Sequence, residues 1–152
     1  MPTLYILIGL PASGKTTYAK TTLKNAYRVC HDDLVDMLMG EYDIKKTATM
    51  HAVEWSIVHT ILSRGEDVVV DRTNLDPVTR ARFINAAQSV DIPVGIIGVV
   101  VDVPIETCKE RNRMRVKPIP DEAYTRLAAH WMPARMEEGF DRLELISPGK
   151  DD

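Results

Sequence analysis

The stretch GLPASGKT, residues 9–16, decides the reading of this chain, because it lies between an apolar run and a segment with helical spacing. It matches the pattern G-x-x-x-x-G-K-S/T, in which glycines allow a tight turn that points successive backbone N–H groups at phosphate oxygens. The helix that follows adds the partial positive charge of its N-terminus. A chance glycine turn needs no strand before it and no helix after it, so we interpret this stretch as a phosphate-binding loop.

The side chains of this loop predict a site for ATP and magnesium. Lys15 is expected to reach the β- and γ-phosphates, and the Thr16 hydroxyl is expected to hold Mg²⁺. The other expected nucleotide-binding residues are Gly9, Pro11, Ala12, Ser13, Gly14 and Thr17.

The rest of the chain alternates predicted strands and helices. Strands are predicted at 4–8, 27–30, 67–71, 93–101 and 142–146. Helices are predicted at 15–26, 34–40, 47–63, 76–89 and 121–131, with another opening at Pro104. Asp33, Asp76 and Asp121 are the expected helix caps. Continuous β-branched runs favour strands covered on both faces, so the predicted fold class is α/β with a largely parallel sheet of about five strands.

Composition limits the function classes. The 152 residues fit one domain, residues 1–152, and 19 Lys and Arg against 22 Asp and Glu give a net charge of −3. A protein that coats nucleic acid indiscriminately would be strongly basic, so any nucleic-acid contact must be local. Two cysteines without motif spacing, no signal peptide and no membrane-length apolar run favour a cytoplasmic protein. Nothing in the sequence assigns an oligomeric state.

Acidic residues follow the predicted second and third strands. Ligands of an open parallel sheet bind beyond the carboxyl ends of its strands, where Asp32, Asp33 and Asp71 should therefore meet the phosphate-binding loop. Asp71, after three valines, looks like a Walker-B acid that holds Mg²⁺. Phosphoryl transfer to an alcohol also uses a carboxylate that accepts the hydroxyl proton, and Asp32 is the candidate. Asp33 is the candidate helix cap.

Five basic residues occur within nine positions, a segment (residues 109–117) that we call the lid: Lys109, Arg111, Arg113, Arg115 and Lys117. On a helix, Arg111 and Arg115 share one face and Arg113 points nearly opposite. Arginine forks that close over a triphosphate would neutralise transition-state charge, and we assign this role to Arg111 and Arg115. Arg113 and Lys117 are expected to be solvated.

Together these segments resemble the 5′-hydroxyl polynucleotide kinase family of P-loop phosphotransferases. The resemblance rests on GLPASGKTT (9–17), HDD (31–33), VVVDRTNLDP (68–77), VDVP (101–104) and the lid sequence RNRMR (111–115). It implies the P-loop NTPase fold with sheet order 2-3-1-4-5, ATP and Mg²⁺ as cofactors and Asp32 as general base. It also implies that Arg115 is the essential lid arginine and that Arg111 lies on the nucleotide side.

The sequence departs from that family on the acceptor side. The phage member has an arginine before the acid pair and another just after it, and both touch the acceptor's phosphate. His31 and Val35 occupy those positions here. The sequence therefore leaves the identity of the acceptor open. It is the 5′ end of a nucleic acid or another alcohol, such as a nucleoside or a hydroxymethylated base in DNA. A nucleotide-dependent switch is the alternative of another class, although a switch has no need of a base such as Asp32.

Two further features are expected to matter less. His51, Trp55 and His59 are spaced as one half-buried helix face rather than a metal site. Thr73 and Asn74 are loop residues beside the site, and their sequence favours neither a substrate contact nor a structural role.

Overall fold

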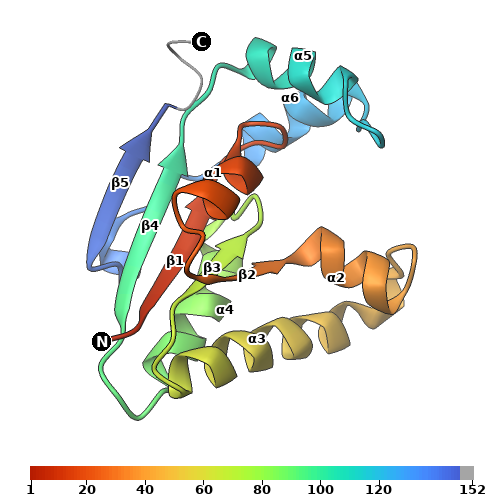
Figure 1. The fold of residues 1–152 in the computed structure, drawn as a ribbon. Coiled ribbons are helices and arrows are strands. Elements are labelled where there is room, and N and C mark those ends of the chain that lie inside the picture. The colour runs from red at the N-terminus through yellow and green to blue at the C-terminus, as the bar shows by residue number, and fades with distance from the viewer. Residues whose placement is uncertain (148–152) are drawn as a thin grey trace.

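The computed structural model describes residues 1–147. The strands in this part of the chain are β1 (Thr3–Ile8), β2 (Tyr27–Cys30), β3 (Val68–Asp71), β4 (Gly95–Val101) and β5 (Arg142–Ile146). All neighbouring strands pair in parallel, in the order β2-β3-β1-β4-β5 (Figure 1). This topology confirms the predicted α/β class and the strand order that the resemblance implied.

Helices connect the strands and cover both faces of the sheet. They are α1 (Lys15–Thr21), α2 (His31–Leu38), α3 (Thr47–Ser63), α4 (Pro77–Gln88), α5 (Ile105–Arg113) and α6 (Asp121–His130), with short 3-10 turns η1 (Ile44–Lys46) and η2 (Met136–Glu138). Val68, Val69 and Val70 are consecutive residues of β3, whose side chains alternate between the two faces, and all three are buried. A strand buried on both faces is what its unbroken valine run predicts.

The helix boundaries show where local signals were misread. The first helix ends at Thr21, short of the predicted 26, because the amide groups of Leu23 and Ala26 bond to Tyr18 and Leu23 in turns that redirect the chain into β2. Asp76 is an N-cap as predicted, since its carboxylate accepts a 2.8 Å hydrogen bond from the Thr79 amide.

The other two predicted caps are wrong. Each helix begins at or before the acidic residue, which therefore lies inside the first turn and not at the N-cap position. Cys30 is the N-cap of α2, so Asp33 lies inside the first turn and pairs with Arg28 instead. Pro120 is the N-cap of α6, and Asp121 pairs with Arg113 of the lid. Both carboxylates still lie where a helix dipole favours negative charge.

The long helix α3 presents two faces to the rest of the molecule. Its buried positions are Met50, Glu54, Val58 and Leu62, whereas the apolar residues Val53, Ile57 and Ile61 are half-buried. The adjacent face packs on α4, where Trp55 donates to Asn85 (3.1 Å) and His59 contacts the Ser89 carbonyl (3.3 Å). The prediction of a half-buried helix face for these residues is confirmed. Within residues 1–147, no helix has the length and hydrophobicity that crossing a membrane requires.

Candidate active site

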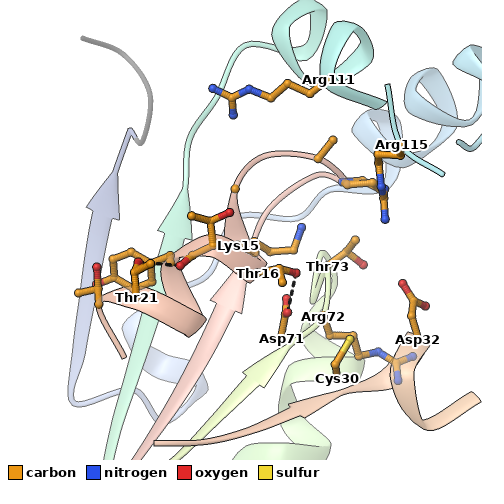
Figure 2. Close-up of a pocket in the computed structure, with 16 residues that line it drawn as sticks. Lys15, Thr16, Thr21, Cys30, Asp32, Asp71, Arg72, Thr73, Arg111 and Arg115 are labelled. Atoms are coloured by element: carbon orange, nitrogen blue, oxygen red, sulfur yellow. Dashed lines mark hydrogen bonds between the residues drawn. The ribbon is translucent and has the colours of Figure 1, made fainter. Parts of the chain in front are cut away.

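The carboxyl ends of β1, β2 and β3 open into one pocket of about 720 Å³. Of the residues predicted for the site, all except Gly9 and Ser13 line it: Pro11, Ala12, Gly14, Lys15, Thr16, Thr17, Asp32, Asp71, Arg111 and Arg115. Figure 2 shows these side chains converging from the loop after β1, the ends of β2 and β3, and the lid. The volume is in the range of small-molecule sites.

The pocket has two ends, with Lys15 and Thr16 between them (Figure 2). We call the first the α1 end, where Figure 2 shows Thr21 and Arg111; Thr17, Tyr18 and Thr22 from the same chain segment as Thr21 also line the pocket. We call the second the α2 end, lined by Cys30, Asp32, Arg72 and Arg115. A ligand that runs along the pocket would therefore place different groups at each end, with its central part on the loop of residues 9–16.

The loop of residues 9–16 has the backbone that its glycines predict. Gly14 caps α1 with φ 102°, a left-handed conformation that costs a residue with a side chain more than it costs glycine. A Cβ atom at Gly9 would lie 2.9 Å from the Val101 carbonyl oxygen, so this position requires glycine for a different reason, the close approach of β4. Ala12 also has a positive φ of 63°. Gly9 and Ser13 thus shape the loop from below rather than facing the pocket.

Lys15 is held against its own loop. The side chain is buried, and its ammonium donates to the carbonyls of Gly9 (3.0 Å) and Leu10 (2.7 Å). Burial disfavours the charged form and lowers the pKa of Lys15 to about 8, although the charge of Asp71 opposes the change. The loop therefore keeps a cation at the centre of the pocket at neutral pH.

Asp71, at the end of β3, joins two side chains that come from other elements. Its Oδ2 atom accepts a 2.7 Å hydrogen bond from the Thr16 hydroxyl and a 2.9 Å hydrogen bond from Arg28 Nε. Arg28, on β2, also donates to Asp33 (2.7 Å), so one guanidinium fixes both carboxylates. Asp71 is almost fully buried, and this pairing holds its carboxylate at the pocket wall.

Asp32 and Asp33 are neighbours with different surroundings. The Asp33 carboxylate is tied to Arg28, and Asp33 does not line the pocket. Asp32 is exposed, lines the α2 end and makes no side-chain hydrogen bond or ion pair with any residue of the described chain. A carboxylate that is open on the pocket side is the one of this pair that could accept a proton from a bound hydroxyl.

The lid arginines reach the pocket by a route that the sequence did not predict. Arg111 lies on α5, and its Nη1 donates to the Ser13 carbonyl (3.4 Å). The helix ends at Arg113, so Arg115 lies in the following turn and not on the same helical face as Arg111. Both nevertheless line the pocket, whereas Arg113 is exposed and pairs with Asp121 at 2.6 Å.

A buried asparagine fixes the turn that carries Arg115. Asn112 donates to the Ile119 carbonyl (2.7 Å) and accepts from the Ile119 amide (3.0 Å), which closes residues 113–118 into a loop. Tyr124 of α6 connects the base of the lid to the phosphate-binding loop, because its hydroxyl donates to the Pro11 carbonyl (2.8 Å). Burial raises the pKa of Tyr124 to about 12, so the hydroxyl keeps its proton. Arg115 is therefore positioned not by a helix but by a turn, in which its amide donates to the Asn112 carbonyl (3.0 Å) and the Asn112 side chain closes the loop.

The loop after β3 separates the roles of Thr73 and Asn74. Thr73 lines the pocket, and its carbonyl accepts from the Gly9 amide (3.0 Å). Asn74 is buried, has φ 48° and donates to the Leu7 carbonyl (2.7 Å), while its own carbonyl accepts from the fully buried Arg80. Asn74 thus joins β1 to α4 as a structural residue, and Thr73 is placed to contact a ligand.

Sequence reasoning missed a second group of side chains at the α2 end. Glu54, only 2% exposed, lies within 3.2 Å of His31 and accepts 2.8 and 3.1 Å hydrogen bonds from Arg72. Burial alone would raise the pKa of Glu54, but hydrogen bonds with His31 and Arg72 and the charge of Arg72 keep it below its ordinary value. One signal in the sequence could have indicated this group. Glu54 is an acidic residue among apolar residues at the same helical spacing, and a buried carboxylate requires a cation or a hydrogen-bond donor.

Comparisons with known proteins agree with this architecture. A family model described as an AAA domain matches residues 4–138. The chain belongs to this family. A protein of Acanthamoeba polyphaga mimivirus, provisionally named a bifunctional polynucleotide phosphatase/kinase, is 26% identical over 152 residues that cover 95% of this chain and 33% of that protein.

Two further relatives extend the comparison. The bifunctional polynucleotide phosphatase/kinase of Schizosaccharomyces pombe is 25% identical over 94% of this chain, so the chain spans about a third of the length of these curated relatives. The solved structure of a Pnkp1/Rnl/Hen1 complex is similar with a TM-score of 0.63 and 26% identity, covering 78% of this chain and 41% of the matching chain. The names of the two curated relatives thus refer to polynucleotide kinases, the family that the sequence resembles.

Proposed function

We propose that this chain is an ATP- and Mg²⁺-dependent kinase that transfers the γ-phosphoryl group to a hydroxyl acceptor, the 5′-hydroxyl of a polynucleotide. The observation that carries the proposal is the single pocket in which Lys15, the Thr16–Asp71 pair, the open carboxylate of Asp32 and two lid arginines converge. The similarity to polynucleotide phosphatase/kinases supports the choice of acceptor.

The donor set at Thr16 and Asp71 suits magnesium. A hydroxyl and a carboxylate oxygen 2.7 Å apart at the pocket wall are hard ligands, and Mg²⁺ completes its shell with waters and phosphate oxygens. Bound there, the ion would neutralise charge on the β- and γ-phosphates. Thr16 would then turn its hydroxyl hydrogen away from Asp71, and Arg28 would keep the carboxylate in place.

Each remaining residue has a role that follows from its position. The backbone N–H groups of residues 11–17 and the Lys15 ammonium bind the phosphate chain, with the nucleoside at the α1 end under Arg111. Asp32 accepts the proton of the acceptor hydroxyl at the α2 end, and Arg115 binds the equatorial oxygens of the transferred group. Closure of the lid excludes water, so that transfer to the alcohol is favoured over hydrolysis of ATP.

Incubation with γ-labelled ATP and Mg²⁺ tests the proposal against its alternatives. The acceptors are DNA and RNA oligonucleotides with a free 5′-hydroxyl, the same oligonucleotides with a 5′-phosphate as blocked controls, nucleosides and hydroxymethyluracil DNA. We expect label chiefly on the 5′-hydroxyl oligonucleotides, much weaker label on nucleosides, and none on any acceptor with Lys15→Ala. Label on nucleosides alone would favour the small-alcohol alternative. Nucleotide binding without transfer to any acceptor would favour a switch.

The small-alcohol alternative is retained because one observation favours it. Val35 is buried and His31 is tied to Glu54, so neither replaces the two arginines that flank the acid pair in the phage relative. If the acceptor carries a phosphate, the cation that binds it must come from elsewhere in the chain.

A further inference from the structure

Arg72 is the one arginine of the α2 end that is contributed by the strand side of the pocket. It follows Asp71 directly and lines the pocket with Asp32, Cys30 and Arg115 (Figure 2). Its side chain is 21% exposed, so part of the guanidinium remains accessible to a ligand.

The guanidinium of Arg72 is held from one side. The Nη1 atom donates to both Glu54 oxygens (2.8 and 3.1 Å) and lies 3.0 Å from His31 Nδ1. Every hydrogen bond that the described residues make to this guanidinium goes to Nη1, which leaves Nη2 and Nε for another partner. Glu54 is 2% exposed on the buried side of α3, so the anchor itself is rigid.

Two arginines lie near the buried carboxylate of Glu54. Arg72 and Arg82 approach this buried carboxylate together with His31 and His51, and Asp76 is the other acid near Arg82. Burial lowers the pKa of Arg82, and the charge of Arg72 lowers it further; burial and the same two arginines lower the pKa of His51. The repulsion between the two arginines is reduced when an anion binds beside them.

We propose that Arg72 binds an anionic phosphate of the acceptor next to the reacting hydroxyl, and that Glu54, through its hydrogen bonds, is the positioning residue that aims Arg72. The inference rests on the proposed kinase function and narrows its substrate class to hydroxyl acceptors that carry a neighbouring phosphate. Asp32 and Arg72 line the same end of the pocket, so they are placed to contact the hydroxyl and the phosphate of one acceptor.

The closing experiment compares two acceptors that differ by a single phosphate, thymidine and thymidine 3′-phosphate, both with a free 5′-hydroxyl. For each, kcat, KM and the KM for ATP are measured with the unmodified protein, Arg72→Gln, Arg72→Lys and Glu54→Gln. Arg113→Gln is the matched control, since Arg113 is exposed and outside the pocket. The double variant Glu54→Gln/Arg72→Gln removes both charges together and so avoids a buried, unpaired carboxylate.

We expect Arg72→Gln and the double variant to lower kcat/KM for thymidine 3′-phosphate by roughly tenfold or more, mainly through KM, and to change thymidine little. Glu54→Gln should cause a smaller loss with the same acceptor selectivity, and Arg72→Lys should recover part of the activity. Equal losses with both acceptors would overturn the proposal, since Arg72 would then act on the transferred phosphoryl group or the fold. Unchanged kinetics in the double variant would overturn it as well.

Binding distinguishes failure of this inference from failure of the kinase proposal. If the unmodified protein transfers neither to these two compounds nor to the 5′-hydroxyl oligonucleotides, the kinase proposal fails, and calorimetric titration with the two compounds still tests Arg72. Tighter binding of thymidine 3′-phosphate than of thymidine, lost in Arg72→Gln, would uphold the subsite. Equal affinity of the unmodified protein for both compounds would overturn it.

Discussion

The two ends of the pocket are assembled in different ways. The centre and the α1 end come largely from one continuous segment, residues 9–22, whose backbone and first helical turn form the phosphate cradle. The α2 end combines side chains from β2, α2, the loop after β3 and the lid, and is anchored by a buried acid on α3. A ligand shared by many enzymes can be bound by local backbone geometry, whereas selection among acceptors uses side chains that only folding brings together.

The largest loss of activity is expected from substitutions at the centre of the pocket. Lys15→Ala and Thr16→Ala should each reduce phosphoryl transfer by roughly a thousandfold or more, because both lose contacts to the charge that develops in the transition state. Burial of the Lys15 ammonium is itself unfavourable, so the Ala variant should unfold at no lower temperature than the parent protein. Radiometric transfer assays and thermal unfolding check this, with the exposed Lys20→Ala on the same helix as control.

A smaller effect is expected at the α2 end. Asp32→Asn should slow transfer by about a hundredfold with little change in ATP affinity, since a positioned base contributes that much and serves the acceptor. Asp33→Asn is the neighbouring control. It breaks an exposed pair with Arg28, which is worth about 1 kcal/mol or less, and should leave turnover within a few fold. If Asp33→Asn slowed transfer more than Asp32→Asn, the general base would be Asp33 and our assignment would be wrong.

The lid tests whether geometry or charge matters. Arg111→Lys and Arg115→Lys keep the charge and lose the planar fork, so each should lower kcat by roughly tenfold. Arg113→Lys should be nearly silent, because Arg113 is exposed and pairs with Asp121 outside the pocket. Turnover and ATP affinity are measured at low and high salt. Equal losses in all three variants that fade as salt rises would identify the lid as an electrostatic patch.

The smallest expected effect is a pH dependence at the centre of the pocket. With the pKa of Lys15 near 8, the ammonium loses its proton between pH 7 and 9, and ATP affinity of the free protein should fall by roughly tenfold over that range. Folding stability should change in the opposite direction. Unfolded Lys15 keeps its proton up to its ordinary pKa, so the native state binds fewer protons and gains stability as pH rises above about 8.

Calorimetric titration with ATP and denaturant titration across this range measure the two trends. Lys15→Arg stays charged at every pH tested and should flatten the affinity profile. A parent protein whose ATP affinity does not change between pH 7 and 9 would contradict the lowered pKa.

The sequence failed where roles depend on neighbours far along the chain. Asp32 and Asp33 are identical residues in adjacent positions. They differ because Arg28 of β2 pairs with Asp33 and leaves Asp32 without an ion pair among the described residues. Arg111 and Arg115 were assigned to the site by helical spacing, yet the helix ends between them, and Asn112 with Ile119 brings Arg115 back to the pocket. The prediction thus named two residues that line the pocket, but it assumed a local geometry that the structure does not have.

What the sequence by itself determined is the part of the protein that follows from short-range patterns. The glycine spacing of residues 9–16, the valine run before Asp71 and the alternation of strand and helix predict the phosphate-binding loop, the edge of the sheet where it lies and the parallel topology. These follow from backbone sterics and side-chain periodicity, which act over a few residues.

Only the tertiary structure decided the contacts of Arg28, Glu54 and Arg72. Glu54 is separated from Arg72 by 18 residues and Arg28 from Asp71 by 43, and no local pattern specifies such pairs. The physical reason is burial: an acid placed on the inner side of α3 requires a cation, and the fold determines which arginine can reach it and where its remaining donors point.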